Sequence, residues 1–114
     1  MIFWDSSAIV PLITREDSSE KILQVYKADP KMLVWWATEL ECVSAIGRRE
    51  RETKLHAGHL SSALGRLKRL AERWHEVQAG DRLRVTAKRL LRTHNLRTAD
   101  ALQLAAAVTL GAGD

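Results

Sequence analysis

The sequence predicts an α/β domain in which helices pack on both faces of a short parallel sheet. Two apolar runs, at residues 1–5 and 32–36, contain almost no polar residues before they end, which is typical of strands buried on both faces. Each run leads directly into a segment with helical periodicity. Because strands that alternate with helices favour a parallel sheet, we expect an α/β/α sandwich whose strands begin with these two runs.

Length and composition fit a single small domain. The chain has 114 residues, 46% of them hydrophobic, so we expect one domain over residues 1–114 with one core. No apolar run is long enough to span a membrane, and the first residues lack the pattern of a signal peptide. The single cysteine, Cys42, cannot form an internal disulfide. We therefore expect a cytoplasmic protein without a membrane partner, with Cys42 as a small buried residue rather than a nucleophile.

The first half of the chain contains two strand–helix units. The strand at residues 1–5 precedes a short helix, for which Asp5 is a suitable N-cap. An acidic turn begins the next helix, over residues 17–28, which ends before a proline. The strand at residues 32–36 leads into a helix over residues 38–50. We interpret its two tryptophans as core residues rather than as platforms for nucleic-acid bases.

The second half is mostly helical. Residues 56–74 form a strongly periodic segment with one apolar stripe, and residues 76–79 fit a short third strand. A helix over residues 82–94 follows. The last helix, from residue 98, is apolar on nearly every side, so we expect it to be buried.

The charge is unevenly distributed along the chain. Residues 1–46 carry four basic and seven acidic side chains, a net charge of −3, whereas residues 47–114 carry fourteen basic and seven acidic ones, a net charge of +7. An acidic pocket beside a basic surface suits a metal-dependent enzyme that acts on a polyanion. A basic excess is equally consistent with a solvated surface. The candidate contacts to a nucleic acid are Arg48, Arg49, Arg84, Lys88 and Arg92.

Three carboxylates stand where a strand ends or a helix begins: Asp5, Glu41 and Asp100. Each has a structural explanation by itself. Asp5 is a suitable N-cap, Glu41 is the partner of Thr38 in a capping box, and Asp100 complements the helix dipole after Thr98. Together they form a cluster of like charges, which is unfavourable unless a cation lies among them. Oxygen ligands of this kind suit Mg²⁺ or Mn²⁺, which activates a bound water for attack on a phosphodiester.

Three stretches carry a resemblance to a known family. They are Asp5-Ser6-Ser7-Ala8-Ile9-Val10, the pattern Thr38-x-x-Glu41-x-x-Ser44-Ala45-Ile46-x-Arg48, and Leu96-Arg97-Thr98-Ala99-Asp100-Ala101-Leu102-Gln103-Leu104-Ala105-Ala106-Ala107. With them the chain resembles PIN-domain ribonucleases and, among these, the VapC-type toxins of bacterial toxin–antitoxin modules.

The resemblance implies a PIN-like α/β/α sandwich and a Mg²⁺- or Mn²⁺-dependent endoribonuclease. It also implies a homodimer that cuts structured RNA such as tRNA and is inhibited by a cognate VapB-type antitoxin. Carried over by motif, Asp5, Glu41 and Asp100 would be the metal-binding and catalytic acids. Ser6 and Thr98 would be supporting polar groups in the same pocket.

One departure from the family concerns the end of the chain. Family members usually continue past the alanine-rich helix into a further strand that carries a fourth acid. Here the sequence reaches Asp114 in a loop context that does not match that motif, which leaves open whether the C-terminal strand is missing. Three acids still suffice for one Mg²⁺, because that ion keeps several waters.

Other functional classes fit the sequence less well. A phosphatase of the haloacid-dehalogenase type needs a second aspartate two residues after the first, where this chain has Ser7. A histidine-based ribonuclease needs two histidines placed as acid and base, and no motif places them here. His56 and His59 are three residues apart, but no further metal ligand accompanies them. The main alternative is a non-catalytic or truncated PIN-like module that binds nucleic acid, which leaves the three acids unexplained.

Overall fold

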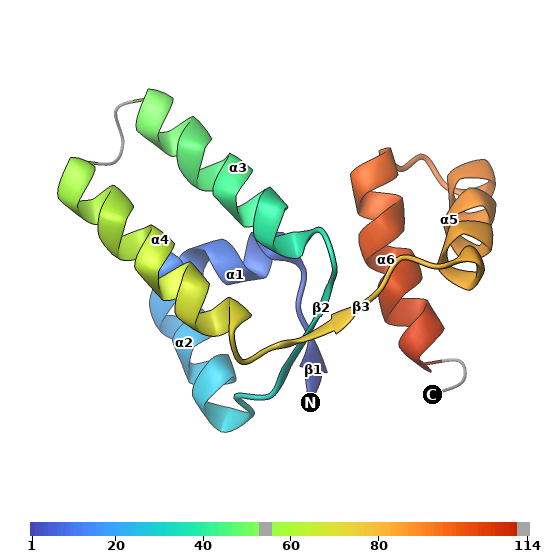
Figure 1. Cartoon of the computed structure of the whole chain (residues 1–114), viewed down its shortest axis with the longest axis horizontal. Coiled ribbons are helices and arrows are strands. Elements are labelled where there is room, and N and C mark those ends of the chain that lie inside the picture. Colours follow the sequence, from blue (N-terminus) through green and yellow to red (C-terminus); the bar gives the residue numbers. More distant parts are fainter. Residues whose placement is uncertain (53–55, 112–114) are drawn as a thin grey trace.

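The computed structural model describes residues 1–52 and 56–111 of the chain. Strands and helices alternate along these residues, as Figure 1 shows. In chain order the elements are β1 (Ile2–Phe3), α1 (Ser6–Ile13), α2 (Ser19–Ala28), β2 (Met32–Trp35), α3 (Thr38–Arg51), α4 (Ala57–Ala71), β3 (His75–Val77), α5 (Asp81–Thr93) and α6 (Thr98–Gly111).

The described residues form one three-stranded sheet in the order β1-β2-β3, and both strand pairs are parallel. Ile2 lies opposite Met32, and Leu33 lies opposite His75. The predicted parallel sheet is thus confirmed, but its strands are shorter than expected. β1 ends at Phe3 because the chain turns at Asp5 into α1, and β3 covers residues 75–77 rather than 76–79.

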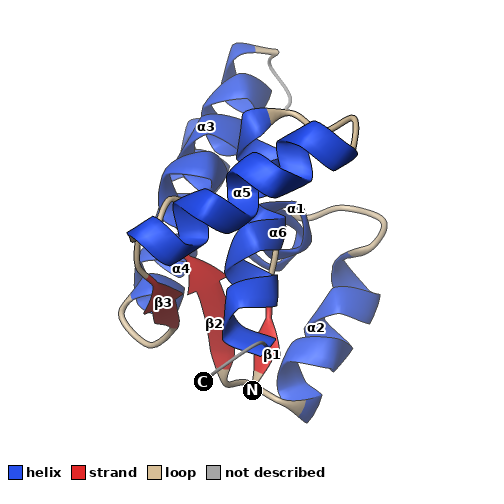
Figure 2. Cartoon of the chain, turned by 90° about the vertical axis from the view of Figure 1, so that its right-hand side faces the viewer, coloured by secondary structure: helices blue, strands red, loops and turns tan. Residues whose placement is uncertain are grey.

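Helices cover both faces of the sheet, so the α/β/α arrangement is confirmed. On one face, Val34 of β2 belongs to a buried cluster with Ile9, Ile46 and Leu67 from α1, α3 and α4. On the other face, Trp35 belongs to a second cluster with residues of α5 and α6, namely Leu83, Ala87, Ala105 and Ala106. Figure 2 looks from the side of α5 and α6 and shows both helices in front of the sheet.

Two helices end or lie differently from the prediction. α4 stops at Ala71 rather than continuing to Trp74, because the chain tightens after the Glu72 C-cap: the backbone N–H of Arg73 donates to Leu70 O, only three residues back, at 3.0 Å. The turn carries the Trp74 side chain into the core, where it is 7% exposed. α6 is not buried on all sides, since Leu104 and Val108 are exposed while Ala101 is fully buried. The expected terminal loop falls mostly on residues 112–114, which lie outside the described residues.

No helix in the described parts of the chain combines the length and the hydropathy that a membrane crossing needs.

Candidate active site

Asp5 lies just beyond the carboxyl end of β1 and caps α1. Its Oδ2 atom accepts a hydrogen bond from the backbone N–H of Ser7 at 3.0 Å and a second, short one from the Ser7 hydroxyl. The expected capping role of Asp5 is therefore present. The carboxyl edge of a parallel sheet is also where α/β proteins bind their ligands.

Glu41 lies in the first turn of α3 and is held by a residue of another helix. Its Oε1 atom accepts a short hydrogen bond from Nε2 of Gln103 in α6. The same Nε2 atom donates to Oγ1 of Thr38 at 3.2 Å. The capping box expected between Thr38 and Glu41 is wrong: α3 has no side-chain cap, because Ala37 occupies the N-cap position and Thr38 is already helical.

The three acids interact electrostatically. The pKa of the Glu41 carboxyl is raised above its ordinary value, first because burial desolvates its charged form. The hydrogen bond from Gln103 acts in the opposite direction, and the negative charges of Asp5 and Asp100 raise the pKa further. The fold therefore brings Asp5 and Asp100 close enough to Glu41 for their charges to act on its carboxyl.

A cavity of about 500 Å³ opens beside Glu41. Its wall includes two more of the predicted site residues, Ser6 and Arg48, so both signs of charge border it. Asp5 and Asp100 do not line this cavity, although their chain neighbours Ser6 and Ala99 do. The complete lining is Ser6, Ser7, Val10, Ala37, Leu40, Glu41, Ser44, Ala45, Arg48 and Ala99.

Thr98 lies in a different cavity from Glu41. It lines a space of about 410 Å³ together with Trp35, Arg84 and Lys88. Successive residues of a helix point about 100° apart, so Thr98 and Ala99 at the start of α6 face different cavities. Two of the predicted nucleic-acid contacts, Arg84 and Lys88, thus share a cavity with Thr98 and not with Glu41.

Arg49 and Arg92, the other two predicted contacts, differ in their surroundings. Arg49 pairs with Glu16, and both side chains are partly buried. Arg92 is exposed in the last turn of α5. Arg49 therefore has a structural role within the chain, and Arg92 continues the basic face that Arg84 and Lys88 begin.

The donor chemistry of the acids fits a hard divalent cation, but their side chains are turned to other partners. Asp5 caps α1, and Glu41 is bonded to Gln103. Accordingly, the described residues contain no group of three or more His, Cys, Asp or Glu side chains already arranged to hold a metal ion. A carboxylate accepts at both oxygens, so these bonds, which use Oδ2 of Asp5 and Oε1 of Glu41, leave Oδ1 and Oε2 for an ion.

The comparison with protein families decides what this fold is. The PIN domain family matches the chain over residues 2–113. The chain belongs to the PIN-domain family. A search of curated proteins finds no significant match to it. PIN domains are generally nucleases, and they typically use a divalent metal, so this PIN domain is a member of a nucleic-acid-cleaving family.

The sequence did not predict the role of Gln103 at the site of this PIN domain. Its side chain is 5% exposed, and its Nε2 atom joins Thr38 and Glu41. Its Oε1 atom is buried and has no hydrogen-bond partner among the described residues. The available signal was its isolation as a polar residue within an apolar helix, because a buried amide needs partners.

Proposed function

We propose that this PIN domain is a metal-dependent endoribonuclease, the toxin of a VapBC-type toxin–antitoxin system in the cytoplasm. It cleaves phosphodiester bonds of RNA, with tRNA as the first substrate to test, by means of a metal-activated water. The observation that carries the proposal is the position of Glu41 on the wall of a cavity, with Asp5 and Asp100 close enough that their charges add to the effect of burial on its pKa. In a member of a nuclease family, such repelling acids indicate a cation site.

In this mechanism Asp5, Glu41 and Asp100 would hold Mg²⁺ or Mn²⁺. The bound ion would supply a water of lowered pKa and stabilise the negative charge that develops on the phosphate. Gln103 fixes the orientation of Glu41, and Ser6 offers a hydroxyl to the same cavity.

The basic residues around the acids position the RNA. Arg48 lines the cavity of Glu41 and would neutralise a phosphate there. Arg84 and Lys88 line the neighbouring cavity, and Arg92 extends their face, so they would hold the strand beyond the cleavage point.

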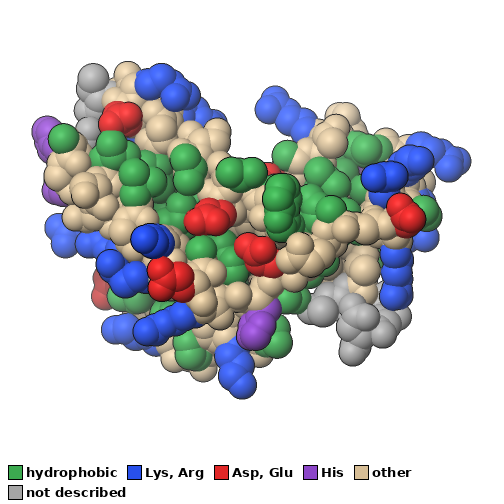
Figure 3. All heavy atoms as spheres, in the orientation of Figure 1, with side chains coloured by type: hydrophobic (Ala, Val, Ile, Leu, Met, Phe, Trp, Pro, Cys, Tyr) green, Lys and Arg blue, Asp and Glu red, His purple; other side chains and the backbone are tan. Residues whose placement is uncertain are grey.

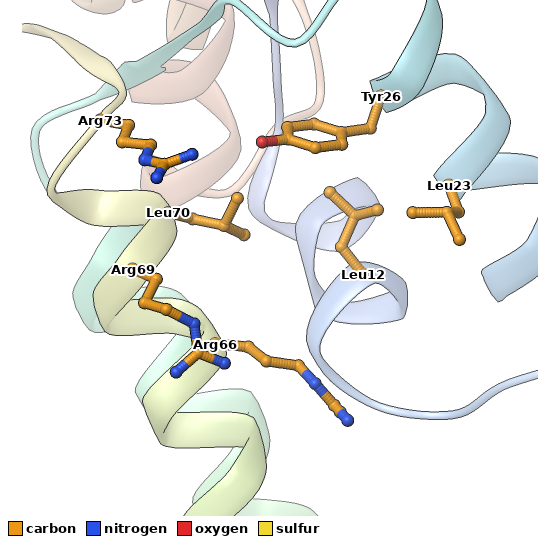
Figure 4. A pocket seen from close by; sticks show the side chains of 7 residues that line it. All are labelled: Leu12, Leu23, Tyr26, Arg66, Arg69, Leu70 and Arg73. Atoms are coloured by element: carbon orange, nitrogen blue, oxygen red, sulfur yellow. The ribbon is translucent and has the colours of Figure 1, made fainter.

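A toxin of this type also needs an inhibitory partner. A pocket of about 240 Å³ lies between α4 and α2. In Figure 4, Arg69 of α4 and Arg73, just after the end of α4, stand opposite Tyr26 and Leu23 of α2. Its remaining lining is Leu12, Arg66 and Leu70, and no acidic side chain belongs to it. An amphipathic antitoxin segment with acidic residues fits this apolar and basic surface, and a basic residue of the same antitoxin would enter the acidic cavity.

We further propose that the protein forms a homodimer through α2 and α3. α2 buries none of its residues within the chain and exposes Leu23 and Val25, and α3 exposes Leu40 and Val43. Light scattering at micromolar concentration tests this: a strictly monomeric mass contradicts it.

The decisive experiment compares Asp100→Asn with the wild type on purified total RNA, with and without Mg²⁺ or Mn²⁺. We expect metal-dependent cleavage by the wild type and none by the variant. Asp17→Asn is the matched control, because Asp17 is an exposed acid near the start of α2, and it should cleave normally. Full cleavage by Asp100→Asn overturns the metal-site proposal.

The alternative function is a non-catalytic PIN-like module that binds or regulates nucleic acid. It is favoured by the internal hydrogen bonds of Asp5 and Glu41, which give both acids a structural role. A double change of Asp5 and Asp100 to alanine separates the two functions. The enzyme loses turnover but keeps RNA binding, whereas the binding module changes little in any assay.

A further inference from the structure

Trp36 differs from the other tryptophans of the chain in being exposed. Trp4, Trp35 and Trp74 are 3%, 5% and 7% exposed, whereas Trp36 is 49% exposed, so its predicted place in the core is wrong. The reason is its position. Its backbone N–H still donates to Val77 O at 3.0 Å, but β2 and β3 have ended there and nothing covers the outer part of the indole.

The Trp36 indole is also held in place. Its ring packs edge-on against Trp35, with centroids 6.4 Å apart and planes inclined by 69°. Trp35 itself is buried between the sheet and the helices α5 and α6. The Trp36 indole therefore leaves about half of its surface open to solvent while it contacts a buried ring.

Trp36 lies in the chain between two residues that line the two cavities of the site. The residue before Trp36 is Trp35, which lines the cavity of Arg84 and Lys88, and the residue after it is Ala37, which lines the cavity of Glu41. Figure 3 shows hydrophobic side chains in the notch between the part of the molecule that contains α3 and the part that contains α5 and α6. Trp36 is thus part of the short segment that connects the two cavities, and an RNA strand that runs from the acids to α5 would pass this segment.

We propose that Trp36 is a stacking platform for an unpaired base of the RNA substrate. Every base has a π-face that stacks on an aromatic side chain, and the adjacent basic residues bind the phosphates on either side of it. Bases within a duplex are covered by their neighbours, so stacking on Trp36 selects single-stranded segments and loops. The inference rests on the proposed ribonuclease function and adds the class of substrate that the site accepts.

The test measures RNA binding in EDTA, where metal-dependent cleavage cannot occur. The probes are an unstructured RNA oligomer and the same oligomer annealed into a duplex, both end-labelled for fluorescence anisotropy. We expect Trp36→Ala to weaken binding of the single strand about tenfold and to leave the duplex unchanged. Trp36→Phe should retain most of the affinity because it keeps an aromatic face. Val108→Ala, which removes an exposed apolar side chain on α6, is the control and should bind like the wild type.

Tryptophan fluorescence gives a second readout that does not depend on affinity. Because the other three indoles are buried, quenching by the RNA oligomer reports mainly on Trp36. We expect quenching in the wild type and its loss in Trp36→Phe at RNA concentrations that saturate binding. This comparison holds even if Trp36→Ala fails to fold.

Several outcomes overturn the proposal. Trp36 does not contact the RNA if Trp36→Ala binds the single strand as tightly as the wild type does, or if the wild type binds RNA without quenching of its fluorescence. A dimeric wild type with a monomeric Trp36→Ala variant, measured by light scattering, assigns the indole to a contact between two copies instead. If the wild type cleaves RNA but the Trp36 variants give one of these contrary results, the proposed ribonuclease function stands and only the role of Trp36 is refuted. If the wild type neither binds nor cleaves RNA, both proposals are refuted.

Discussion

Gln103 of α6 donates a hydrogen bond to the carboxylate of Glu41 in α3, across 62 positions of the chain. Through the same Nε2 atom it reaches Thr38 at 3.2 Å. Gln103 is 5% exposed and Thr38 is fully buried, so this contact is shielded from water. The contact joins the helices that carry two of the three candidate metal ligands, Glu41 and Asp100.

Replacing Gln103 should therefore disturb both stability and the site. Gln103→Leu leaves the Glu41 carboxylate and the Thr38 hydroxyl without their donor, which costs about 1–3 kcal/mol of unfolding free energy. It should also raise the pKa of Glu41 further, because the hydrogen bond from Gln103 lowers it. Urea unfolding measures the first effect, and NMR titration of the carboxyl carbon measures the second. Gln24→Leu, on the exposed side of α2, is the control; equal losses in both variants would contradict the prediction.

The raised pKa of Glu41 makes the metal-free protein less stable as the pH rises. The folded state holds the Glu41 proton more tightly than the unfolded chain does, because burial and the charges of Asp5 and Asp100 disfavour ionisation. The resulting stabilisation is fully present below the pKa of the unfolded carboxyl and is lost as the pH rises through the higher folded value. Glu41→Gln should therefore melt above the wild type at neutral pH in EDTA, and the difference should vanish in acid. A constant difference across the titration would refute this assignment.

Divalent metal should stabilise the folded chain through the same acids. At a free Mg²⁺ concentration of about 100 times Kd, mass action adds about 2.7 kcal/mol to the unfolding free energy. Asp5→Asn should abolish this gain, yet leave the stability in EDTA nearly unchanged, because asparagine caps a helix about as well as aspartate. Thermal melts with and without Mg²⁺ check both statements. If Mg²⁺ stabilises Asp5→Asn as much as Asp17→Asn, the ion binds elsewhere.

The fold was largely predictable because its signals are local. Two uninterrupted apolar runs mark β1 and β2, and the helical periodicities between them give the order of the layers. Their lengths were less predictable, since β1 keeps only two residues before the turn at Asp5. Which side of a uniformly apolar helix remains uncovered depends on its packing partners, so the exposure of Leu104 in α6 has no local signal.

The candidate site was predictable only in part. Motifs in the sequence single out Asp5 and Glu41, and the structure places Asp5 just beyond β1 and Glu41 in the first turn of α3, but whether they bind metal stays a prediction. Thr98 lies outside the cavity of Glu41 because of the exact residue at which α6 begins, and the sequence does not predict a helix start to within one residue. The contact between Gln103 and Glu41 joins distant parts of the chain, which no spacing rule reveals.

Cys42 should be chemically inert in the folded protein. It is fully buried in the core, and burial, with smaller contributions from Glu41 and nearby acids, raises the pKa of its thiol to about 12. The reactive thiolate is therefore almost absent at pH 8. A thiol reagent such as DTNB should label no cysteine of the native chain and one in guanidinium chloride. Rapid labelling of the native chain would contradict the buried, neutral thiol.

The basic face of α5 should govern how strongly RNA binding depends on salt. Arg84 and Lys88 are on one face of α5 beside the cavity of Thr98, and Arg84 has only a long contact of 3.8 Å to the exposed Asp81. Each phosphate contact contributes about 0.7 to the slope of log K against log salt for a single strand, so changing both residues to glutamine should reduce the slope by about 1.4. Arg49→Gln is the matched control, because Arg49 already pairs with Glu16 and should contribute little. Anisotropy titrations of a labelled RNA oligomer in EDTA at several salt concentrations measure the slopes. Equal slopes for the wild type and the double variant would mean that the RNA does not run along α5.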